Sequence, residues 1–183
     1  MAIDGTYFGT TGTVNAFCLV VFRDEENKED VWWKFYEVET YEVYTEGKDF
    51  LISLRYVIKG VTADGLPLIR TVFKDIPFQM CLVHMERIIT RGTTKFPLLE
   101  AGKVLLAIAT TFNSLYALFP FLFTYEYDHR ISKTTNSIEG HFHHIDVRAS
   151  VHHGLSLQRK QKLITAILLN SSVTLKGGLD LKS

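Results

Sequence analysis

Residues 16–38 read AFCLVVF, RDEENKED and VWWKFYEV, an apolar run and an aromatic run joined by a charged loop. The run Ala16–Phe22 has the continuous apolar pattern of a strand that is buried on both faces. The run Val31–Val38 is rich in aromatic and β-branched residues, which favour strands. Because the loop Arg23–Asp30 is short and polar, we expect the two strands to pair as an antiparallel hairpin.

Strand and helix patterns extend from this hairpin in both directions. Met1–Phe8 reads as a strand before it, and Gly9–Asn15 is a turn rich in glycine and threonine. Hydrophobic periodicity and breaker residues predict the next four elements: a helix at Tyr41–Ile58 ended by Gly60, a strand at Val61–Gly65, a short helix at Leu66–Phe73 and a strand at Phe78–His84. Mainly helical segments follow from Glu86 to Phe123. A helix then begins after Thr134-Thr135-Asn136, with an apolar stripe of Ile138, Phe142, Ile145 and Ala149, and a C-terminal helix is predicted at Leu155–Leu169.

This order of elements predicts an α/β fold, with a mixed five-stranded sheet flanked by helices. Three antiparallel strands followed by parallel strands that alternate with helices give the element order of the ribonuclease-H-like fold. The chain of 183 residues is long enough for one domain with a sizeable core, so we expect residues 1–183 to form a single domain. In such a sheet, ligands bind beside the ends of the central strands, where the strand order reverses.

The composition indicates a globular protein of a reducing compartment. Hydrophobic residues make up 46% and charged residues 22%, which is typical of globular chains. The two cysteines, Cys18 and Cys81, make no disulfide framework, and the N-terminus has no secretory signal. The formal net charge is zero, so the bulk charge carries no signature of nucleic-acid binding. The apolar stretch Val104–Phe123 is long enough to span a bilayer, but polar residues and Pro120 interrupt it, which favours a buried helical hairpin.

Three acidic residues are expected to meet at one rim of the sheet. Asp4 is the carboxylate of the first strand and Asp64 ends the fourth, and these strands are neighbours in a mixed sheet of this order. Glu139, in the first turn of its helix, can be laid against the same rim. Three converging carboxylates repel one another unless a cation binds, and they suit Mg²⁺ or Mn²⁺. Two such ions about 3.5–4 Å apart would activate the attacking oxygen and stabilise the leaving oxygen of a phosphoryl transfer.

Each of these acids also has a plain structural interpretation. Asp4 and Asp64 are both followed by glycine, and Asp-Gly is a common turn dipeptide. Glu139 lies three residues after Asn136, as the last residue of a capping box does. Because a carboxylate turned back to its own backbone is less free to bind a cation, we expect Asn136 or Thr135 to cap the helix and Glu139 to point toward Asp4 and Asp64.

Five motifs resemble, in order, the landmarks of bacterial insertion-sequence transposases of the Mutator-related DDE group. They are DGTYFG at Asp4–Gly9, GVTADG ending at Asp64-Gly65, CLVH at Cys81–His84, TTNSIEG at Thr134–Gly140 and VHHGLS at Val151–Ser156. The resemblance covers nearly the whole chain. It implies the ribonuclease-H-like catalytic core of a metal-dependent recombinase, which hydrolyses a DNA strand at the element end and joins the freed 3′-hydroxyl to target DNA. Asp4, Asp64 and Glu139 match the catalytic and metal-binding triad of this family, with Mg²⁺ or Mn²⁺ as cofactor.

The resemblance also implies partners, a location and a second motif. The partners would be insertion-sequence ends and target DNA, bound by a homo-oligomer in the bacterial cytoplasm at the nucleoid, with no membrane involved. Cys81 and His84 match the Cys-x-x-His signature of the group. We interpret them as a buried thiol and a histidine that pack and hydrogen-bond behind the site. The alternative, a structural zinc site, needs four ligands and would require His141, His143 or His144 from elsewhere.

A basic surface beside the acidic site is expected to hold DNA phosphates. The candidates are Arg159 and Lys160 on the last helix, together with Arg148 and His153 before it. The alternative for each is an ordinary solvated helix face. Trp32-Trp33 offers stacking surfaces for bases, although aromatic residues in strands more often belong to the core or the sheet surface.

The chain departs from the family pattern in two places. Met1 lies only three residues before Asp4, whereas family members carry an upstream DNA-binding region. The helical insertion at residues 86–130 is shorter than that of the family, and the apolar stretch changes character near residues 110–113, where we hypothesise an internal deletion. We therefore expect a transposase core, either active or an inactive remnant. The alternative is a non-catalytic ribonuclease-H-like module that binds DNA or a full-length transposase.

Overall fold

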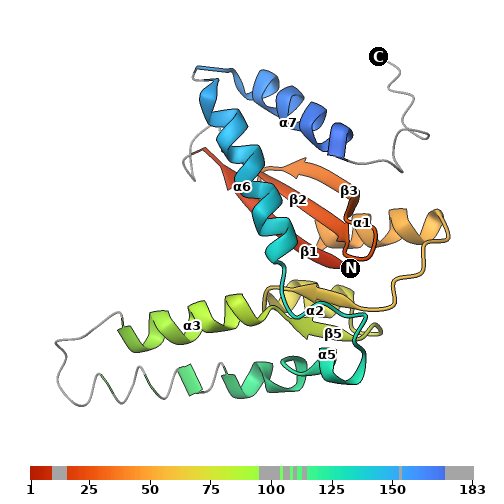
Figure 1. Ribbon diagram of the computed structural model, residues 1–183, viewed down its shortest axis with the longest axis vertical. Helices are drawn as coiled ribbons and strands as arrows, with labels where there is room; N and C mark the ends of the chain where they lie inside the picture. Colours follow the sequence, from red (N-terminus) through yellow and green to blue (C-terminus); the bar gives the residue numbers. More distant parts are fainter. Residues whose placement is uncertain are drawn as a thin grey trace.

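The computed structural model describes residues 1–9, 16–94, 104, 108, 111–112, 115–152 and 154–171. Within these residues the chain forms a five-stranded mixed sheet in the order β3-β2-β1-β4-β5. The strands are β1 (Ala2–Phe8), β2 (Phe17–Asp24), β3 (Glu29–Tyr36), β4 (Val61–Ala63) and β5 (Phe78–Met80). The helices are α1 (Tyr41–Ser53), α2 (Pro67–Val72), α3 (Leu82–Thr94), α5 (Thr124–Tyr127), α6 (Asn136–Val151) and α7 (Leu157–Ser171), with the 3-10 helix η1 (Phe119–Phe121). The predicted α/β class, with a mixed five-stranded sheet flanked by helices, is confirmed (Figure 1).

The strands β1, β2 and β3 form an antiparallel meander, as the apolar and aromatic runs predict. β2 pairs with β1 on one side and with β3 on the other. Its residues Phe17–Phe22 are all buried, because helices cover both faces of the sheet. Alternate residues therefore enter different cores: Phe22 faces the core under α1, and Val21 faces the core under α6.

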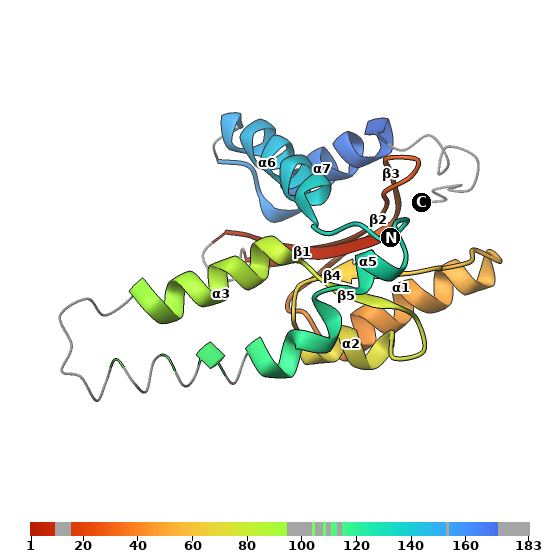
Figure 2. The same cartoon turned by 60° about the horizontal axis from the view of Figure 1, so that its bottom comes forward.

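Two hydrophobic cores lie on opposite faces of the sheet. The first lies between the sheet and the helices α1 and α2 and includes Ile3, Phe22, Tyr44, Leu51 and Phe73. The second lies between the sheet and the helices α6 and α7 and includes Phe8, Leu19, Ile138, Ile145 and Leu168. Figure 2 shows these two helix pairs above and below the sheet. The predicted apolar stripe of α6 is confirmed, since Ile138, Phe142, Ile145 and Ala149 are all buried.

Helix α1 ends at Ser53, so the prediction that it continues to Ile58 and stops at Gly60 is wrong. Arg55 adopts a left-handed conformation with φ 60°. The N–H of Arg55 donates to the carbonyl of Ile52 at 2.8 Å, and the N–H of Tyr56 donates to the carbonyl of Leu51 at 2.9 Å. These two bonds form a Schellman motif, which ends a helix whether or not glycine occupies the left-handed position.

The fifth strand is shorter than predicted, and this places His84 in a helix instead of a strand. β5 ends at Met80, and the N–H of Cys81 donates to the Ala63 carbonyl at 2.7 Å. The N–H of Met85 then donates to the Cys81 carbonyl at 3.0 Å, which opens α3. Cys81 therefore lies at the junction of β5 and α3, and His84 lies in the first turn of α3.

The stretch that follows α3 is described only in part. Leu118 and Leu122 pack with Met80 and Met85 in a third, smaller apolar cluster beside the end of β5. Within the described part of the chain, no helix is long and apolar enough to cross a membrane. Part of the segment at residues 86–130, including residues 110 and 113 of the hypothesised seam, lies outside the described residues, so the shortened insertion and the deletion both stay predictions.

Candidate metal-binding site

The parallel pairing of β1 with β4 brings Asp4 and Asp64 close enough for the charge of Asp64 to act on Asp4. Ala2 pairs with Thr62, and each aspartate lies two residues further along its own chain. A two-residue step keeps a side chain on the same face, and Ala2 belongs to the core that α6 covers. Asp64 follows the last residue of β4, as predicted, whereas Asp4 lies inside β1 and not at its end.

Three side chains from three elements converge on this face. They are Asp4 from β1, His84 from α3 and Glu139 from α6, and one candidate ligand atom of each lies within 4.8 Å of the other two. The Nε2 atom of His84 lies 3.8 Å from Oε1 of Glu139. Among the described residues this is the only group of three or more His, Cys, Asp or Glu side chains with such spacing. The structure thus brings Asp4 and Glu139 together, adds His84 to them, and leaves Asp64 just outside the group.

Burial dominates the electrostatics of the two aspartates. It raises the pKa of Asp4 to about 7, and the charges of Asp64 and Glu139 act in the same direction. His84 and the Gly5 N–H, which donates to Oδ1 of Asp4 at 2.9 Å, oppose this rise in the pKa of Asp4. Burial also raises the pKa of Asp64. A carboxyl held partly protonated by burial becomes a metal ligand when a cation replaces its proton.

The turn interpretation applies to only one of the two Asp-Gly pairs. Oδ1 of Asp64 accepts a hydrogen bond from the Leu66 N–H at 3.1 Å, so Asp64 does shape the turn into α2. Asp4 and Gly5 lie in a strand, where the turn interpretation is wrong. Gly5 instead leaves room for the Glu39 side chain, since a Cβ at Gly5 would lie 1.8 Å from Oε1 of Glu39 and the carboxylate would have to move.

Glu139 is turned toward the cluster and away from its own helix. Its oxygens accept two hydrogen bonds from Arg87, from Nη1 to Oε1 at 3.2 Å and from Nη2 to Oε2 at 2.8 Å. The capping-box interpretation of Glu139 is therefore wrong. The expected side-chain cap is also wrong: Thr135 occupies the N-cap position, but its hydroxyl donates to Sγ of Cys81 at 3.4 Å and not to a helix N–H.

Cys81 and His84 influence each other behind the acidic group. Burial acts to raise the pKa of the Cys81 thiol, but hydrogen bonds with His84 and Thr135 outweigh it and lower that pKa to about 7. Interaction with Cys81 raises the pKa of His84, against the effect of burial. The zinc alternative gains no support among the described residues, where no group of three or more candidate ligands contains Cys81 and where His141 instead contacts Asp30.

The position of Glu139 depends on how α6 is fixed to the β2–β3 hairpin. The Ser137 hydroxyl donates to Glu25, and Nε2 of His141 lies 2.8 Å from Oδ2 of Asp30. Ser137 and His141 each lie two residues from Glu139, about 200° around the helix. Contacts on the hairpin side of α6 therefore direct Glu139 to the opposite side, where the cluster lies.

No family model, curated protein or solved structure matches this chain. The family assignment therefore stays a prediction that the sequence motifs carry.

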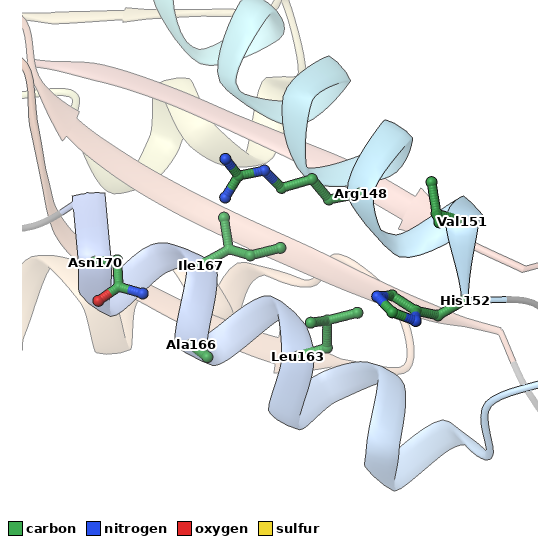
Figure 3. A pocket seen from close by; sticks show the side chains of 7 residues that line it. All are labelled: Arg148, Val151, His152, Leu163, Ala166, Ile167 and Asn170. Atoms are coloured by element: carbon green, nitrogen blue, oxygen red, sulfur yellow. The ribbon is translucent and has the colours of Figure 1, made fainter.

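The predicted DNA-binding residues lie on α6 and α7. Arg148 is exposed and borders a hollow of about 370 Å³ between these helices (Figure 3). Arg159 is exposed as well, whereas the Nζ atom of Lys160 lies 5.1 Å from the centre of the Phe8 ring. His153 lies outside the described residues. The two tryptophans belong to the hydrophobic cores, which was the alternative to base stacking: Trp32 is buried in the first core and Trp33 packs against the second.

The sequence interpretation missed Arg87 and the position of His84 in the cluster. Cys81, His84 and Arg87 recur at intervals of three, which places His84 and Arg87 on one face of a helix. This signal was present in the sequence. It was not used because the apolar run before it predicted a strand that continued through His84.

Proposed function

We propose that the chain is the ribonuclease-H-like catalytic core of a DDE transposase, which cleaves a DNA strand at an element end and transfers it to target DNA. The observation that carries the proposal is the convergence of Asp4, His84 and Glu139 within 4.8 Å, beside Asp64. The sheet order, with an antiparallel meander joined to two parallel strands, supports the fold assignment.

The donor set of the cluster fits a divalent cation. Asp4 and Glu139 supply hard carboxylate oxygens, and His84 supplies an imidazole nitrogen, which suits Mn²⁺ better than Mg²⁺. These three residues would hold the ion, with Asp64 next to them, directly after β4. A bound cation of this kind polarises a phosphodiester and makes a water or hydroxyl oxygen a better nucleophile.

The residues of the chain itself hold the donors in place. Asp4 is only 9% exposed, so its carboxylate has little access to bulk water. The N–H and the hydroxyl of Thr135, at the start of α6, each donate to Sγ of Cys81, just before α3, at 3.4 Å. This contact sets the helix that carries Glu139 beside the helix that carries His84, so the buried thiol has a positioning role.

A second candidate function, a non-catalytic module that binds DNA or a full-length transposase, is favoured by one observation. Arg87 engages both oxygens of Glu139 and so neutralises one of the three donors. If this pair is permanent, the cluster lacks a free third ligand and binds no cation. The two functions therefore differ in whether the purified protein binds metal.

Metal binding and DNA cleavage test the proposal together. We expect Mn²⁺ to raise the thermal unfolding temperature of the wild-type protein, and Asp4→Asn or Glu139→Gln to abolish this rise. Glu42→Gln, on the exposed start of α1, is the matched control and should respond as wild type does. The wild-type protein should nick or join DNA that carries element ends in the presence of the metal. A wild-type protein that neither binds Mn²⁺ nor cleaves DNA, yet binds DNA or an intact transposase, would establish the non-catalytic module.

A further inference from the structure

We propose that Arg87 binds a DNA phosphodiester, and that in the free protein Glu139 holds the Arg87 guanidinium in place of the metal cation. The inference rests on the proposed function and assigns a role to a residue outside the acidic group. It concerns an exchange of partners, in which no covalent bond is formed or broken.

The first step of the argument is the geometry of the Arg87–Glu139 pair. Nη1 lies 3.2 Å from Oε1 and Nη2 lies 2.8 Å from Oε2, so the pair is bidentate. The Arg87 side chain is 49% exposed and the Glu139 side chain is 25% exposed. A guanidinium that is half in solvent can leave its partner without exposing a buried surface, and an exposed pair of this kind contributes little to stability.

The second step is that the guanidinium and a cation would use the same oxygen. Oε1 of Glu139 accepts the hydrogen bond from Nη1 of Arg87 and also lies 3.8 Å from Nε2 of His84. A cation held by His84 and Glu139 would therefore lie beside the positive charge of Arg87. Like charges at such short range repel strongly in a partly buried site, so cation binding favours release of Arg87.

The third step identifies the group that the released guanidinium can bind. A guanidinium has a planar fork of donors that matches the oxygens of a phosphate as well as those of a carboxylate. A phosphodiester at the metal site would lie within reach of Arg87, because Arg87 already contacts one of the proposed ligands. The Arg87 guanidinium would then leave Glu139 and bind a DNA phosphate, and the Glu139 carboxylate would become free to bind the cation. By linkage, DNA and the cation would each tighten the binding of the other.

The experiment measures Mn²⁺ affinity by electron paramagnetic resonance without DNA, and duplex DNA affinity by fluorescence anisotropy. We expect Arg87→Gln to bind Mn²⁺ at least about fivefold more tightly than wild type, and to bind duplex DNA at least about fivefold more weakly. Arg87→Lys keeps the charge without the fork, so it should bind Mn²⁺ as weakly as wild type and still lose DNA affinity.

Arg130→Gln is the matched control. Arg130 forms the same kind of exposed bidentate pair, with Nε 2.8 Å from Oδ1 and Nη2 2.6 Å from Oδ2 of Asp128, and neither residue belongs to the acidic group. Its loss should leave Mn²⁺ affinity unchanged. If wild type and Arg87→Gln bind Mn²⁺ equally, or if their DNA affinities are equal, the role of Arg87 is overturned while the metal site stands. If neither protein binds Mn²⁺, the proposed function fails and this inference fails with it.

Discussion

Nε2 of His141 lies 2.8 Å from Oδ2 of the buried Asp30, and this contact joins α6 to the β2–β3 hairpin. The other oxygen of Asp30 lies 2.6 Å from Nη1 of Arg23, and the Asp30 side chain has no exposed surface. Both oxygens of a fully buried carboxylate thus have partners that lie on different elements. The orientation of the helix that presents Glu139 depends on this arrangement.

Removing Asp30 should therefore destabilise the protein strongly. Asp30→Ala leaves Arg23 and His141, whose side chains are only 12% and 11% exposed, without their acidic partner, and we expect a loss of about 3–5 kcal/mol in the free energy of unfolding. Asp128→Ala removes a carboxylate at the surface that is paired with Arg130, and it should cost far less, because water screens such a pair. Urea unfolding of the two variants measures the difference. Equal losses would mean that the buried contact does not fix α6.

Two glycines in helices should respond to alanine in opposite directions. In α1, a Cβ on Gly47 would lie 2.7 Å from Cζ of Phe22 and 2.9 Å from Cε3 of Trp32. We expect Gly47→Ala to cost roughly 1–3 kcal/mol through overpacking, although alanine is the better helix former. In α6, a Cβ on Gly140 would meet nothing within 4 Å, so Gly140→Ala should stabilise by about 0.5–1 kcal/mol. Thermal unfolding of both variants checks the contrast, and a stabilised Gly47→Ala protein would contradict this packing.

The stability of the metal-free protein should fall as the pH rises from 5 to 7.5. The pKa of Asp4 is raised from 3.8 to about 7, so the folded state binds a proton that the unfolded chain has already lost in this range. The pKa of His84 is also raised, and its contribution is likewise lost as the pH rises through its folded value. Urea unfolding at pH 5 and at pH 7.5 gives the slope. Asp4→Asn should flatten it, and a variant with the full wild-type slope would show that Asp4 does not cause it.

Replacing His84 should change which metal the site prefers. His84→Asn exchanges the imidazole nitrogen for an amide oxygen, a donor that suits Mg²⁺ relative to Mn²⁺. We expect Mn²⁺ affinity to fall by at least about tenfold and Mg²⁺ affinity to fall less. Competition between the two ions, followed by calorimetry, measures the ratio. His144→Asn, an exposed position on α6, is the control and should leave both affinities unchanged. An unchanged ratio in His84→Asn would exclude His84 as a ligand.

The parts of the fold that follow from local pattern could be predicted from the sequence. The β2–β3 hairpin depends on an apolar run and an aromatic run joined by a polar loop, and the buried stripe of α6 depends on a period of 3.6 residues; a short stretch displays each pattern by itself. The neighbouring positions of β1 and β4, the strands that carry and precede Asp4 and Asp64, needed only the order of the strands. These features are confirmed because the tertiary structure agrees with the local preference.

Other features depend on partners that are distant in the chain. β5 ends after three residues because α3 begins directly after Cys81, whose carbonyl accepts the hydrogen bond from the Met85 N–H, and no residue type near Cys81 indicates this change. The hydroxyl of Thr135 bonds to Cys81, which a local capping rule cannot foresee. The contact of Arg87 with Glu139 depends on α3 and α6 meeting in space, so pattern alone offered only the shared helix face of His84 and Arg87.

The single ladder position that joins Ala2 to Thr62 sets how far Asp64 lies along the sheet from Asp4. β4 has only three residues, so few positions can hold this register. Side chains alternate along a strand, so a shift of β4 by one residue would change the face that each of its side chains occupies and would displace Asp64. The register is held by the three-residue pairing of β4 with β5 and by the Thr62 N–H, which donates to the Met1 carbonyl at 2.8 Å. These backbone contacts, made by residues without an acidic side chain, therefore set the spacing of the two aspartates.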